Sequence, residues 1–544
     1  MADTEVLIAG AGPVGLTAAI ELSRRGVGCL LVDRLPERLP YAKAVGIQPR
    51  TLEIWDRMGV ARAALDAAVP LRGRLTYVDG AEEARFDLVL PPDVPYRFAS
   101  LPQYDTERVL EERLACHGMR VERGTELVSF EQDADGVTSR LHTIAGHELE
   151  IRSRYLLGCD GAHSVVRRTL GLSFEGGAFA EEYMLADVEV DWDLPDGYAV
   201  RATHHAGDGS VDDLLVCIPL PGRSRYRVSM LVPPELSIQA GAGEGGGGAD
   251  AVAHGVEGGR APRLKHVQAV LDRLSPRPTT ASALRWSSVF RSSHRLAERY
   301  AEGRVFVAGD AAHVHPPTGA QGMNTGIQDA YNLAWKLALT VKGLGQPRLL
   351  GSYDAERRPV GAEVVSRTVR HAAAGVQADP DDPATAVLRQ AQLLIAYPSS
   401  PVVEAGAPSG PRPAPGDRAP DCGGLLDPVA AFPLRLHDVL RGRDHVLLLY
   451  ADSAEQTRPF AELAQEARTL AHGELTCCCV LSAHVDGRPP TLPVLRDSRG
   501  EFKSRYASEG STAFLIRPDG HLSARVSPAG FLGVSAGLTR VFAT

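Results

Sequence analysis

The stretch "VLIAGAGPVGLTAAIELSRRGVGCLLVDR", residues 6–34, decides the fold. An apolar run over 6–9 predicts a buried strand, and the pattern G-x-G-x-x-G follows it directly at 10–15. The next residues have the apolar spacing of a helix that ends at Gly26, and a second apolar run leads to Asp33. Strand, glycine turn, helix and strand together predict a β-α-β unit of a Rossmann-like α/β domain.

Each part of this unit has a physical task at a dinucleotide. The glycines permit a tight turn and let the backbone approach a pyrophosphate, whose negative charge the helix N-terminus attracts. Asp33 can accept hydrogen bonds from both ribose hydroxyls, and its charge disfavours a 2′-phosphate, so FAD or NAD is expected rather than NADP. A second match to the glycine pattern, at 241–246, has no strand before it and no helix after it. The surrounding segment 240–263 is predicted to be a flexible insertion without function.

A second glycine-rich stretch, "GDAAHVHPPTGAQGMNTGIQDA" at 309–330, follows the short apolar run "RVFVA" and precedes a segment with helical apolar spacing up to Val341. Taken alone, it could be an ordinary buried turn. A rigid loop before a helix N-terminus can also stabilise negative charge on a reduced ring, because free N–H groups and the helix dipole point at it. Asp310 can accept a hydrogen bond from a sugar-alcohol hydroxyl. Because FAD is long enough to need one turn for its ADP part and another for its ribityl-flavin, the two stretches together favour FAD.

Four ordered motifs resemble the signatures of one family, the class A flavoprotein monooxygenases. They are "GAGPVG" with Asp33, "GCDGAHSVVRR" at 158–168, the stretch at 309–330, and "LLGSYDAERRPVG" at 349–361. The resemblance is greatest to the branch of phenol hydroxylases and aromatic polyketide hydroxylases, and it covers about residues 4–370 and, more faintly, the C-terminal part. It implies an enzyme that binds FAD, takes hydride from NAD(P)H without a second Rossmann domain, and uses O2 through a flavin C4a-hydroperoxide to hydroxylate a phenolic ring. By analogy, the expected substrate is bulky or polyketide-like.

The resemblance also implies a role for each matching position. Gln103 would face the ribityl and pyrophosphate region, and Asp160 and Arg167 match a signature tied to both FAD and NAD(P)H. Pro317 and the residues 319–324 would line the flavin ring. One departure is Lys43, where the family often offers an arginine near the flavin; Arg50 is the next basic residue. No catalytic acid or base is assigned. The full expected cofactor-binding set is Gly10, Gly12, Pro13, Gly15, Asp33, Arg34, Lys43, Gln103, Asp160, Arg167, Gly309, Asp310, Pro317, Gly319, Gly322, Met323 and Asn324.

The expected fold class is α/β with three domains. A Rossmann-like FAD-binding domain occupies 1–175 and returns at 291–400, and a substrate-binding β-sheet domain is inserted at 176–290. Arg227, Trp286 and Phe290 could line its pocket, but ordinary packing is the favoured interpretation. After a linker rich in Pro and Gly, a thioredoxin-like domain occupies 415–544.

The C-terminal domain lacks the C-x-x-C pair that thioredoxin chemistry needs, because that position reads Ala-Asp-Ser-Ala-Glu at 451–455. Disulfide exchange is therefore excluded, and this domain is expected to act through packing or oligomerisation, with a homodimer as the assembly to test. The three cysteines at 477–479 lie within a strand pattern and are interpreted as small buried apolar side chains.

Composition excludes several other functions. The formal net charge is -9, the pI is about 6.0 and no cluster of Lys and Arg is found, so nucleic acid is not an expected partner. No window approaches the roughly 18 apolar residues of a membrane helix, and the cysteine pattern fits a reducing compartment, so a soluble cytoplasmic protein is expected. The pairs His204-His205 and His313-x-His315 are expected to have no carboxylate or cysteine as a nearby partner, so no metal is expected.

Two alternatives to a hydroxylase stay open. A flavin-dependent halogenase is disfavoured because its W-x-W-x-I-P motif is absent. An FAD-dependent dehydrogenase or oxidase, and a non-catalytic flavin-binding sensor, share the cofactor signatures and are not excluded by them. Consumption of NADPH without substrate is the measurement that distinguishes these classes.

Overall fold

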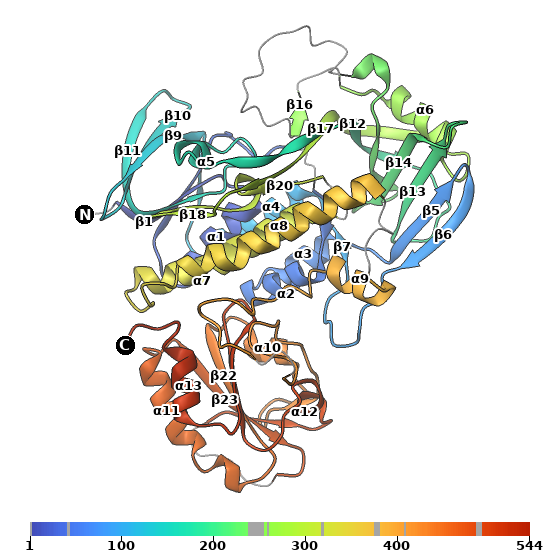
Figure 1. Cartoon of the computed structure of the whole chain (residues 1–544). Coiled ribbons are helices and arrows are strands. Elements are labelled where there is room, and N and C mark those ends of the chain that lie inside the picture. The colour runs from blue at the N-terminus through green and yellow to red at the C-terminus, as the bar shows by residue number, and fades with distance from the viewer. Residues whose placement is uncertain are drawn as a thin grey trace.

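In the computed structural model, the described part of the chain forms four β-sheets with helices around them (Figure 1). The structure describes residues 3–40, 44–237, 255–257, 261–316, 320–374, 381–406, 410–485 and 492–544. The segment 240–263, expected to be a flexible insertion, lies mostly outside these residues. Within it, Gly255–Glu257 forms the short strand β16, which pairs with a neighbouring strand.

The first sheet has a parallel core in the order β19-β11-β1-β2-β8. Its register aligns Ala9 of β1 with Gly158 of β11, and Gly158 with Val307 of β19. The three strands therefore end side by side, and the motifs that follow them begin at one edge of the sheet. This arrangement confirms the predicted β-α-β unit. The strands are β1 (Thr4–Ala9), β2 (Cys29–Asp33), β8 (Val121–Arg123), β11 (Glu148–Gly158) and β19 (Val305–Val307), with β9 (Thr125–Gln132), β10 (Val137–Thr143) and β18 (Ala301–Glu302) attached.

Helices precede or follow the strands of this sheet and pack against them and against one another. α1 (Pro13–Arg24) connects β1 to β2, α4 (Gln103–Ala115) precedes β8, and α5 (Val165–Thr169) follows β11. The long helices α7 (Gly322–Val341) and α8 (Gly351–Ala374) lie side by side, and α7 packs on α1 (Figure 1). α7 is buried from Asn324 to Leu339 and ends at Val341, which agrees with the helical apolar spacing expected up to that residue.

The second sheet has the strand order β16-β17-β12-β15-β14-β13-β5-β6 with β20 on β17, and α6 (Leu264–Leu274) packs on it. It reaches beyond the expected range 176–290, because β5 and β6 come from within 1–175 and β13 pairs in parallel with β5. The hairpin of β5 and β6 joins this sheet through the parallel pairing of β5 with β13, and the sequence order does not reveal that pairing. The strands are β5 (Gly73–Val78), β6 (Ala81–Asp87), β12 (Phe174–Val190), β13 (Tyr198–His205), β14 (Val211–Pro219), β15 (Arg225–Leu231), β17 (Ala281–Ala297) and β20 (His313–Val314).

The C-terminal part has a sheet of its own, in the order β21-β24-β23-β22-β25-β26. β22, β23 and β24 are parallel, whereas β25 and β26 form an antiparallel hairpin beside β22. The cysteines at 477–479 lie on β23 and are at most 2% exposed, which confirms their interpretation as buried side chains. The elements are β21 (Leu425–Leu426), β22 (His445–Ala451), β23 (Leu475–Ser482), β24 (Val494–Asp497), β25 (Thr512–Ile516), β26 (Leu522–Val526), α10 (Leu436–Leu440), α11 (Phe460–Leu470), α12 (Glu501–Arg505) and α13 (Phe531–Leu538).

A small sheet and three helices connect these parts. The sheet has the order β3-β7-β4, and α2 packs against both α7 and α10. In the described residues, no helix is both long and apolar enough to span a membrane. The elements are β3 (Gly46–Ile47), β4 (Val69–Pro70), β7 (Ala99–Ser100), α2 (Pro49–Met58), α3 (Ala61–Ala67) and α9 (Pro383–Gln390).

Candidate cofactor site

The first glycine turn is packed so tightly that two of its positions accept only glycine. A Cβ on Gly10, whose φ is +98°, would lie 2.3 Å from the carbonyl oxygen of Cys159. A Cβ on Gly15 would lie 1.9 Å from the carbonyl oxygen of Gly10. Gly12 differs, because a Cβ there would meet nothing within 4 Å. The backbone just before α1, which opens with Pro13, therefore has open space beside it, and a helix N-terminus attracts the negative charge of a pyrophosphate.

Asp33 stands at the end of β2 with its carboxylate held by the backbone. Ala11 N–H donates to Oδ2 at 2.7 Å, and Leu35 N–H donates to Oδ1 at 2.8 Å. The side chain is still partly exposed, so each oxygen keeps an acceptor site for a ribose hydroxyl. Its neighbour Arg34 is exposed.

Gln103 opens α4 and contacts an acid that the sequence reasoning missed. Its Nε2 donates to Oε1 of Glu107 at 2.9 Å. Burial raises the pKa of Glu107 to about 7, against the opposing effects of Gln103 and Arg123, and the charge of Asp33 adds to the rise. Its spacing of one helical turn from Gln103 was the available signal. A carboxyl group that titrates near neutral pH therefore lies close to the expected ADP site.

Asp160 caps the short helix α5. Its Oδ2 accepts from Val165 N–H at 2.7 Å and from Val166 N–H at 3.1 Å, and Ser164 Oγ donates to Oδ1 at 2.6 Å. Burial raises the pKa of Asp160, and these hydrogen bonds oppose the rise. The carboxylate thus fixes the turn that follows β11, beside the first glycine turn.

Arg167 connects the Asp160 turn to the second glycine stretch. Its guanidinium donates to the carbonyls of Ala311 at 3.0 Å and Ala162 at 2.8 Å, and it lies 3.8 Å from the ring centre of Phe174. The side chain is 3% exposed, and burial lowers its pKa to about 10. These contacts hold two motif turns at a fixed separation.

The second glycine turn packs directly on the first motif. Gly309 starts the short 3-10 helix η3 (Gly309–Ala311) with φ +62°, and a Cβ on it would lie 2.9 Å from Cγ2 of Val14. A Cβ on Gly326 of α7 would lie 2.7 Å from the same Cγ2 and 2.9 Å from Cα of Gly309. The chain therefore brings both glycine stretches together, as one elongated cofactor requires.

Asp329 of α7 is the buried centre of a network behind this turn. Its Oδ2 accepts from Gly309 N–H at 3.2 Å and lies 2.8 Å from Nε2 of His313, while Arg357 Nε donates to Oδ1 at 2.7 Å. Burial alone would raise the pKa of Asp329, but Arg357 and His313 hold it below its ordinary value. Asp329 and Arg357 lie inside two of the quoted motifs, yet no local pattern marks them as partners.

Asn324 ties the expected flavin-ring loop to the segment before α2. Its Oδ1 accepts from Gln48 N–H at 2.9 Å and Thr51 Oγ1 at 2.7 Å, and its Nδ2 donates to the carbonyls of Gly46 and Ala320, each at 2.8 Å. The side-chain amide of Asn324 thus accepts two hydrogen bonds and donates two, and these contacts fix the conformation of the loop. Gly322 begins α7, and Met323 packs against the core. Lys43, Pro317 and Gly319 lie outside the described residues.

The side chain of Arg50, the next basic residue after Lys43, is engaged by Glu53 and by the C-terminal part. It is 2% exposed on α2, where Nη1 donates to Oε2 of Glu53 at 2.8 Å and Nη2 to the carbonyl of Asp519 at 2.5 Å. Because α2 starts at Pro49, its second residue is turned toward the C-terminal part.

The candidate metal pairs have carboxylate neighbours that their sequence context did not reveal. His204 Nδ1 lies 2.6 Å from Asp212, His205 Nδ1 lies 3.3 Å from Asp79, and His313 bonds to Asp329 as described. The expectation that no carboxylate is near was therefore wrong, because strand pairing and helix packing bring these acids in. Even so, no group of three possible metal ligands occurs among the described residues.

Two regions lie away from the glycine turns, namely the interior of the second sheet and a cavity beside α8. In the second sheet, Arg227 is paired with Asp187 at 3.1 Å and is 3% exposed, in line with the packing interpretation, and Phe290 is 1% exposed.

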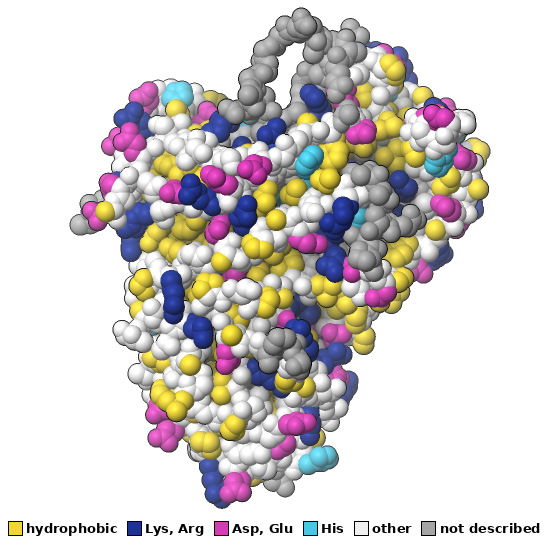
Figure 2. Space-filling model, viewed as in Figure 1, with side chains coloured by type: hydrophobic (Ala, Val, Ile, Leu, Met, Phe, Trp, Pro, Cys, Tyr) yellow, Lys and Arg dark blue, Asp and Glu magenta, His cyan; other side chains and the backbone are white. Residues whose placement is uncertain are grey.

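A cavity of about 360 Å³ lies between α8 and residues 389–400. None of the glycine turns lines this cavity, although Gln392 in its wall bonds to Thr325 of α7 at 2.9 Å. On the face shown in Figure 2, basic and acidic side chains are mixed rather than separated into fields.

Comparison with known proteins places these features in context. The family described as "FAD binding domain" matches residues 3–368. 6-Methylpretetramide 4-monooxygenase of Streptomyces rimosus is 39% identical over 369 residues, which cover 67% of this chain and 61% of that enzyme. Pentachlorophenol 4-monooxygenase of Sphingobium chlorophenolicum is 30% identical over 545 residues, covering 96% of this chain and 94% of that enzyme.

Solved structures match over nearly the whole chain. The ternary complex of aklavinone-11 hydroxylase with FAD and aklavinone superposes with a TM-score of 0.78 and 26% identity, covering 99% of each chain. The similarity therefore includes the C-terminal part as well as the two larger sheets.

Proposed function

The chain belongs to the FAD-binding family of flavoprotein aromatic monooxygenases, and on that premise we propose that it hydroxylates a bulky phenolic substrate with O2 and NAD(P)H. The observation that carries the proposal is the meeting of the two glycine stretches, where Gly309 and Gly326 close on Val14. A cofactor with its ADP part at α1 and its other end at α7 explains why both turns are needed in one place.

The residues of the described site fit FAD. The open space before Gly12 suits the pyrophosphate, and the anchored carboxylate of Asp33 suits the ribose. The start of α7 supplies N–H groups and a positive helix end for the flavin. Bound FAD would accept hydride and activate O2; the protein's part is to orient it, fix the loop through Asn324 and exclude water. The cofactor-binding set derived from the sequence remains a proposal on these grounds.

The substrate class is inferred from relatives. One matched enzyme is named for a pretetramide, and one matched structure holds aklavinone. A polycyclic, polyketide-like phenol is therefore the proposed substrate class for this chain as well, and the second sheet is its proposed binding domain.

NAD(P)H is proposed to reduce the flavin from a transient site, because the flavin signatures occupy the β-α-β unit that begins at β1. Reduction is then expected to be slow without substrate and at least tenfold faster with the right phenol, which corresponds to about 1.4 kcal/mol of barrier. Stopped-flow reduction at saturating NAD(P)H measures both rates. Equal rates would favour a dehydrogenase, or a hydroxylase controlled at a later step.

Turnover of a panel of polycyclic phenols, followed by mass spectrometry, tests the oxygenation itself. The expected product carries one additional oxygen atom, and that atom comes from O2 when the gas is labelled. NAD(P)H oxidation that yields only hydrogen peroxide with every phenol would contradict hydroxylation of this substrate class. A protein that binds no FAD would refute the whole proposal.

The remaining expectations are part of the same proposal. The domain limits given above, with the β5–β6 hairpin added to the substrate-binding sheet, a cytoplasmic location and a homodimer are proposed rather than derived from the site. A thioredoxin-like C-terminal fold is supported by the parallel strands β22 and β23 with α11 between them in sequence, followed by the antiparallel hairpin β25–β26.

A further inference from the structure

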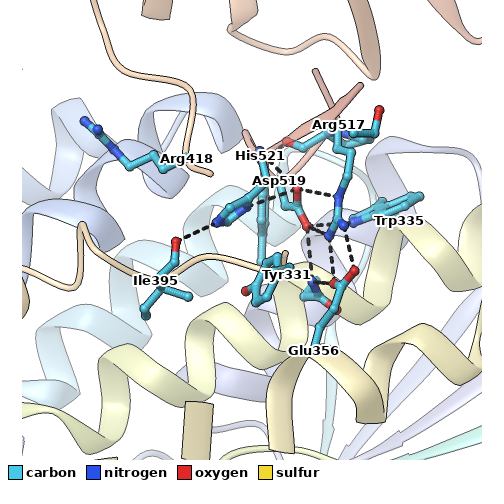
Figure 3. A network of polar contacts seen from close by, with 12 residues as sticks. Tyr331, Trp335, Glu356, Ile395, Arg418, Arg517, Asp519 and His521 are labelled. Carbon is cyan, nitrogen blue, oxygen red and sulfur yellow. Dashed lines mark hydrogen bonds and ion pairs between the residues drawn. The ribbon is translucent and has the colours of Figure 1, made fainter. Parts of the chain in front are cut away.

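The turn between β25 and β26, residues 517–521, is buried although a hairpin turn usually lies in solvent. We call these residues the hairpin tip. Arg517 is 0% exposed, Asp519 is 3% exposed and His521 is 2% exposed. Charged side chains persist in such a place only when they are paired and hydrogen-bonded. Their partners come from the FAD-binding part of the chain (Figure 3).

The charged side chains of the hairpin tip form a buried hydrogen-bonded cluster with side chains of α7 and α8. Arg517 Nη1 and Nη2 donate to the two carboxylate oxygens of Glu356 at 2.6 and 2.8 Å, and its Nε donates to Asp519 at 3.1 Å. Lys336 Nζ donates to Glu356 at 2.8 Å. Asn332 Nδ2 donates to Glu356 at 2.7 Å and to Asp519 at 3.1 Å. Two buried cations thus neutralise two buried carboxylates.

The backbone of the hairpin tip is bound as well. The carbonyl of Pro518 accepts from the hydroxyl of Tyr331 at 3.2 Å, and the carbonyl of Asp519 accepts from Arg50 at 2.5 Å. Gly520 has φ +79°, and a Cβ there would lie 2.7 Å from Nη2 of Arg57. The tip therefore sits against α2 and α7, and a side chain at position 520 would both strain the left-handed backbone and displace the guanidinium of Arg57.

The same two helices hold the second glycine turn. Glu356, which binds Arg517, is followed in α8 by Arg357, whose Nε donates to Asp329 at 2.7 Å. Asp329 lies one helical turn before Asn332 and accepts the N–H of Gly309 at 3.2 Å. Residues one turn apart in α7, and consecutive residues in α8, thus bind the hairpin tip and, through Asp329, the Gly309 turn.

We propose that the hairpin tip is a positioning element of the FAD site, with Arg517 as its positioning residue. The inference rests on the FAD binding proposed above and assigns the C-terminal part a role in it. Without Arg517, Asp519 loses its cation and Glu356 keeps only Lys336 as a charged partner. Helices α7 and α8 can then shift relative to each other near the ion pair of Arg357 with Asp329, and the Gly309 turn loses its fixed position.

The test uses the full-length protein with its bound FAD. Arg517→Met removes the guanidinium and its charge while keeping an unbranched apolar side chain that replaces the aliphatic part of Arg517. Glu474→Gln is the matched control, because Lys342 Nζ binds Glu474 at 2.8 Å across the same interface, just beyond the other end of α7. FAD release is followed as a rise in flavin fluorescence after dilution, and folding is checked by circular dichroism and thermal melting. We expect FAD release at least tenfold faster in Arg517→Met, and within twofold of wild type in Glu474→Gln.

A second variant and the control decide between positioning and general loosening. Arg517→Lys keeps the charge but not the two-pronged contact, so its release rate should lie between those of wild type and Arg517→Met. If Arg517→Met does not fold, Arg517→Lys is judged alone, and a rate equal to wild type overturns the proposal. A folded Arg517→Met with unchanged release, or equal acceleration in Glu474→Gln, also overturns it. Wild-type protein without FAD would instead refute the proposed function.

Discussion

Replacing Gly12 by alanine separates FAD binding from folding. Gly12 precedes α1 with φ -70° and ψ -178°, extended backbone that alanine adopts freely, and a Cβ there meets nothing within 4 Å. Lower entropy of the unfolded chain stabilises the variant by about 0.4–1 kcal/mol, whereas alanine is a poorer N-cap than glycine by a similar amount. Because the two effects offset each other, the free energy of unfolding should change by less than about 1 kcal/mol.

FAD affinity should respond differently to the same methyl group. The backbone of Gly12 faces the space where the pyrophosphate is expected, so the methyl group prevents its close approach to the first N–H groups of α1. We expect at least tenfold weaker binding, equivalent to about 1.4 kcal/mol. Titration of FAD into deflavinated protein, monitored by quenching of flavin fluorescence, gives the dissociation constant, and thermal melting without FAD gives the stability.

Gly28→Ala is the matched control for this prediction. A Cβ on Gly28 also meets nothing within 4 Å, and Gly28 is an exposed residue just before β2, away from the glycine turn. Its FAD affinity should equal that of wild type. A folded Gly12→Ala protein that binds FAD within twofold of wild type would refute the placement of the pyrophosphate against α1.

Three further predictions follow from the site and from the buried polar groups. Asp310→Ala should weaken FAD retention tenfold to a hundredfold, about 1.5–3 kcal/mol for one charge-assisted hydrogen bond, and unchanged retention after gel filtration would remove Asp310 from the site. Changing all three cysteines at 477–479 to serine should lower the melting temperature by burying hydroxyls, while turnover per folded molecule survives; lost turnover in folded protein would contradict a packing role. Burial lowers the pKa of several histidines from 6.5 to about 3 or 4, so they stay neutral in the folded protein while the unfolded chain takes up protons. Stability is therefore fully present above pH 6.5 and falls as the pH drops toward 4, by about 1.4 kcal/mol per pH unit for each histidine, and a melting temperature unchanged between pH 7 and pH 5 would contradict this. These histidines are His315, His437, His445 and His521.

Local chemistry explains which features the sequence alone could predict. The turn at Gly10 could be predicted from the sequence because its conformation and its contact with Cys159 leave room only for glycine, and glycine is easily recognised in a sequence. The buried cysteines at 477–479 are visible because an apolar run of strand length needs no distant partner to be recognised. Features of this kind depend on a few consecutive residues.

Partners that are distant in the sequence could not be predicted in the same way. Arg357 and Asp329 are 28 residues apart, and Arg517 and Glu356 are 161 residues apart. Charged residues are usually exposed, so each of these side chains has the sequence appearance of a surface position. Arg50 shows the same limit, because nothing near it in the sequence indicates that its partner is the carbonyl of Asp519. The packing of α7 on α8 reveals the first pair, and the packing of α8 and α2 against the C-terminal part reveals the other two.

The cost of burying charges bears on what the hairpin tip contributes. A buried ion cluster such as that of Arg517, Glu356, Lys336 and Asp519 is often no more stabilising than apolar residues of the same volume, because desolvation offsets the attraction. An apolar contact, however, tolerates sliding and rotation, whereas the two-pronged contact of Arg517 with Glu356 allows one orientation. If the only requirement were to hold the C-terminal part against the FAD-binding part, an apolar contact would stabilise the interface equally well. The buried charges therefore favour a geometric role for the hairpin tip, in which it fixes α8, and with it Arg357, at one position relative to α7.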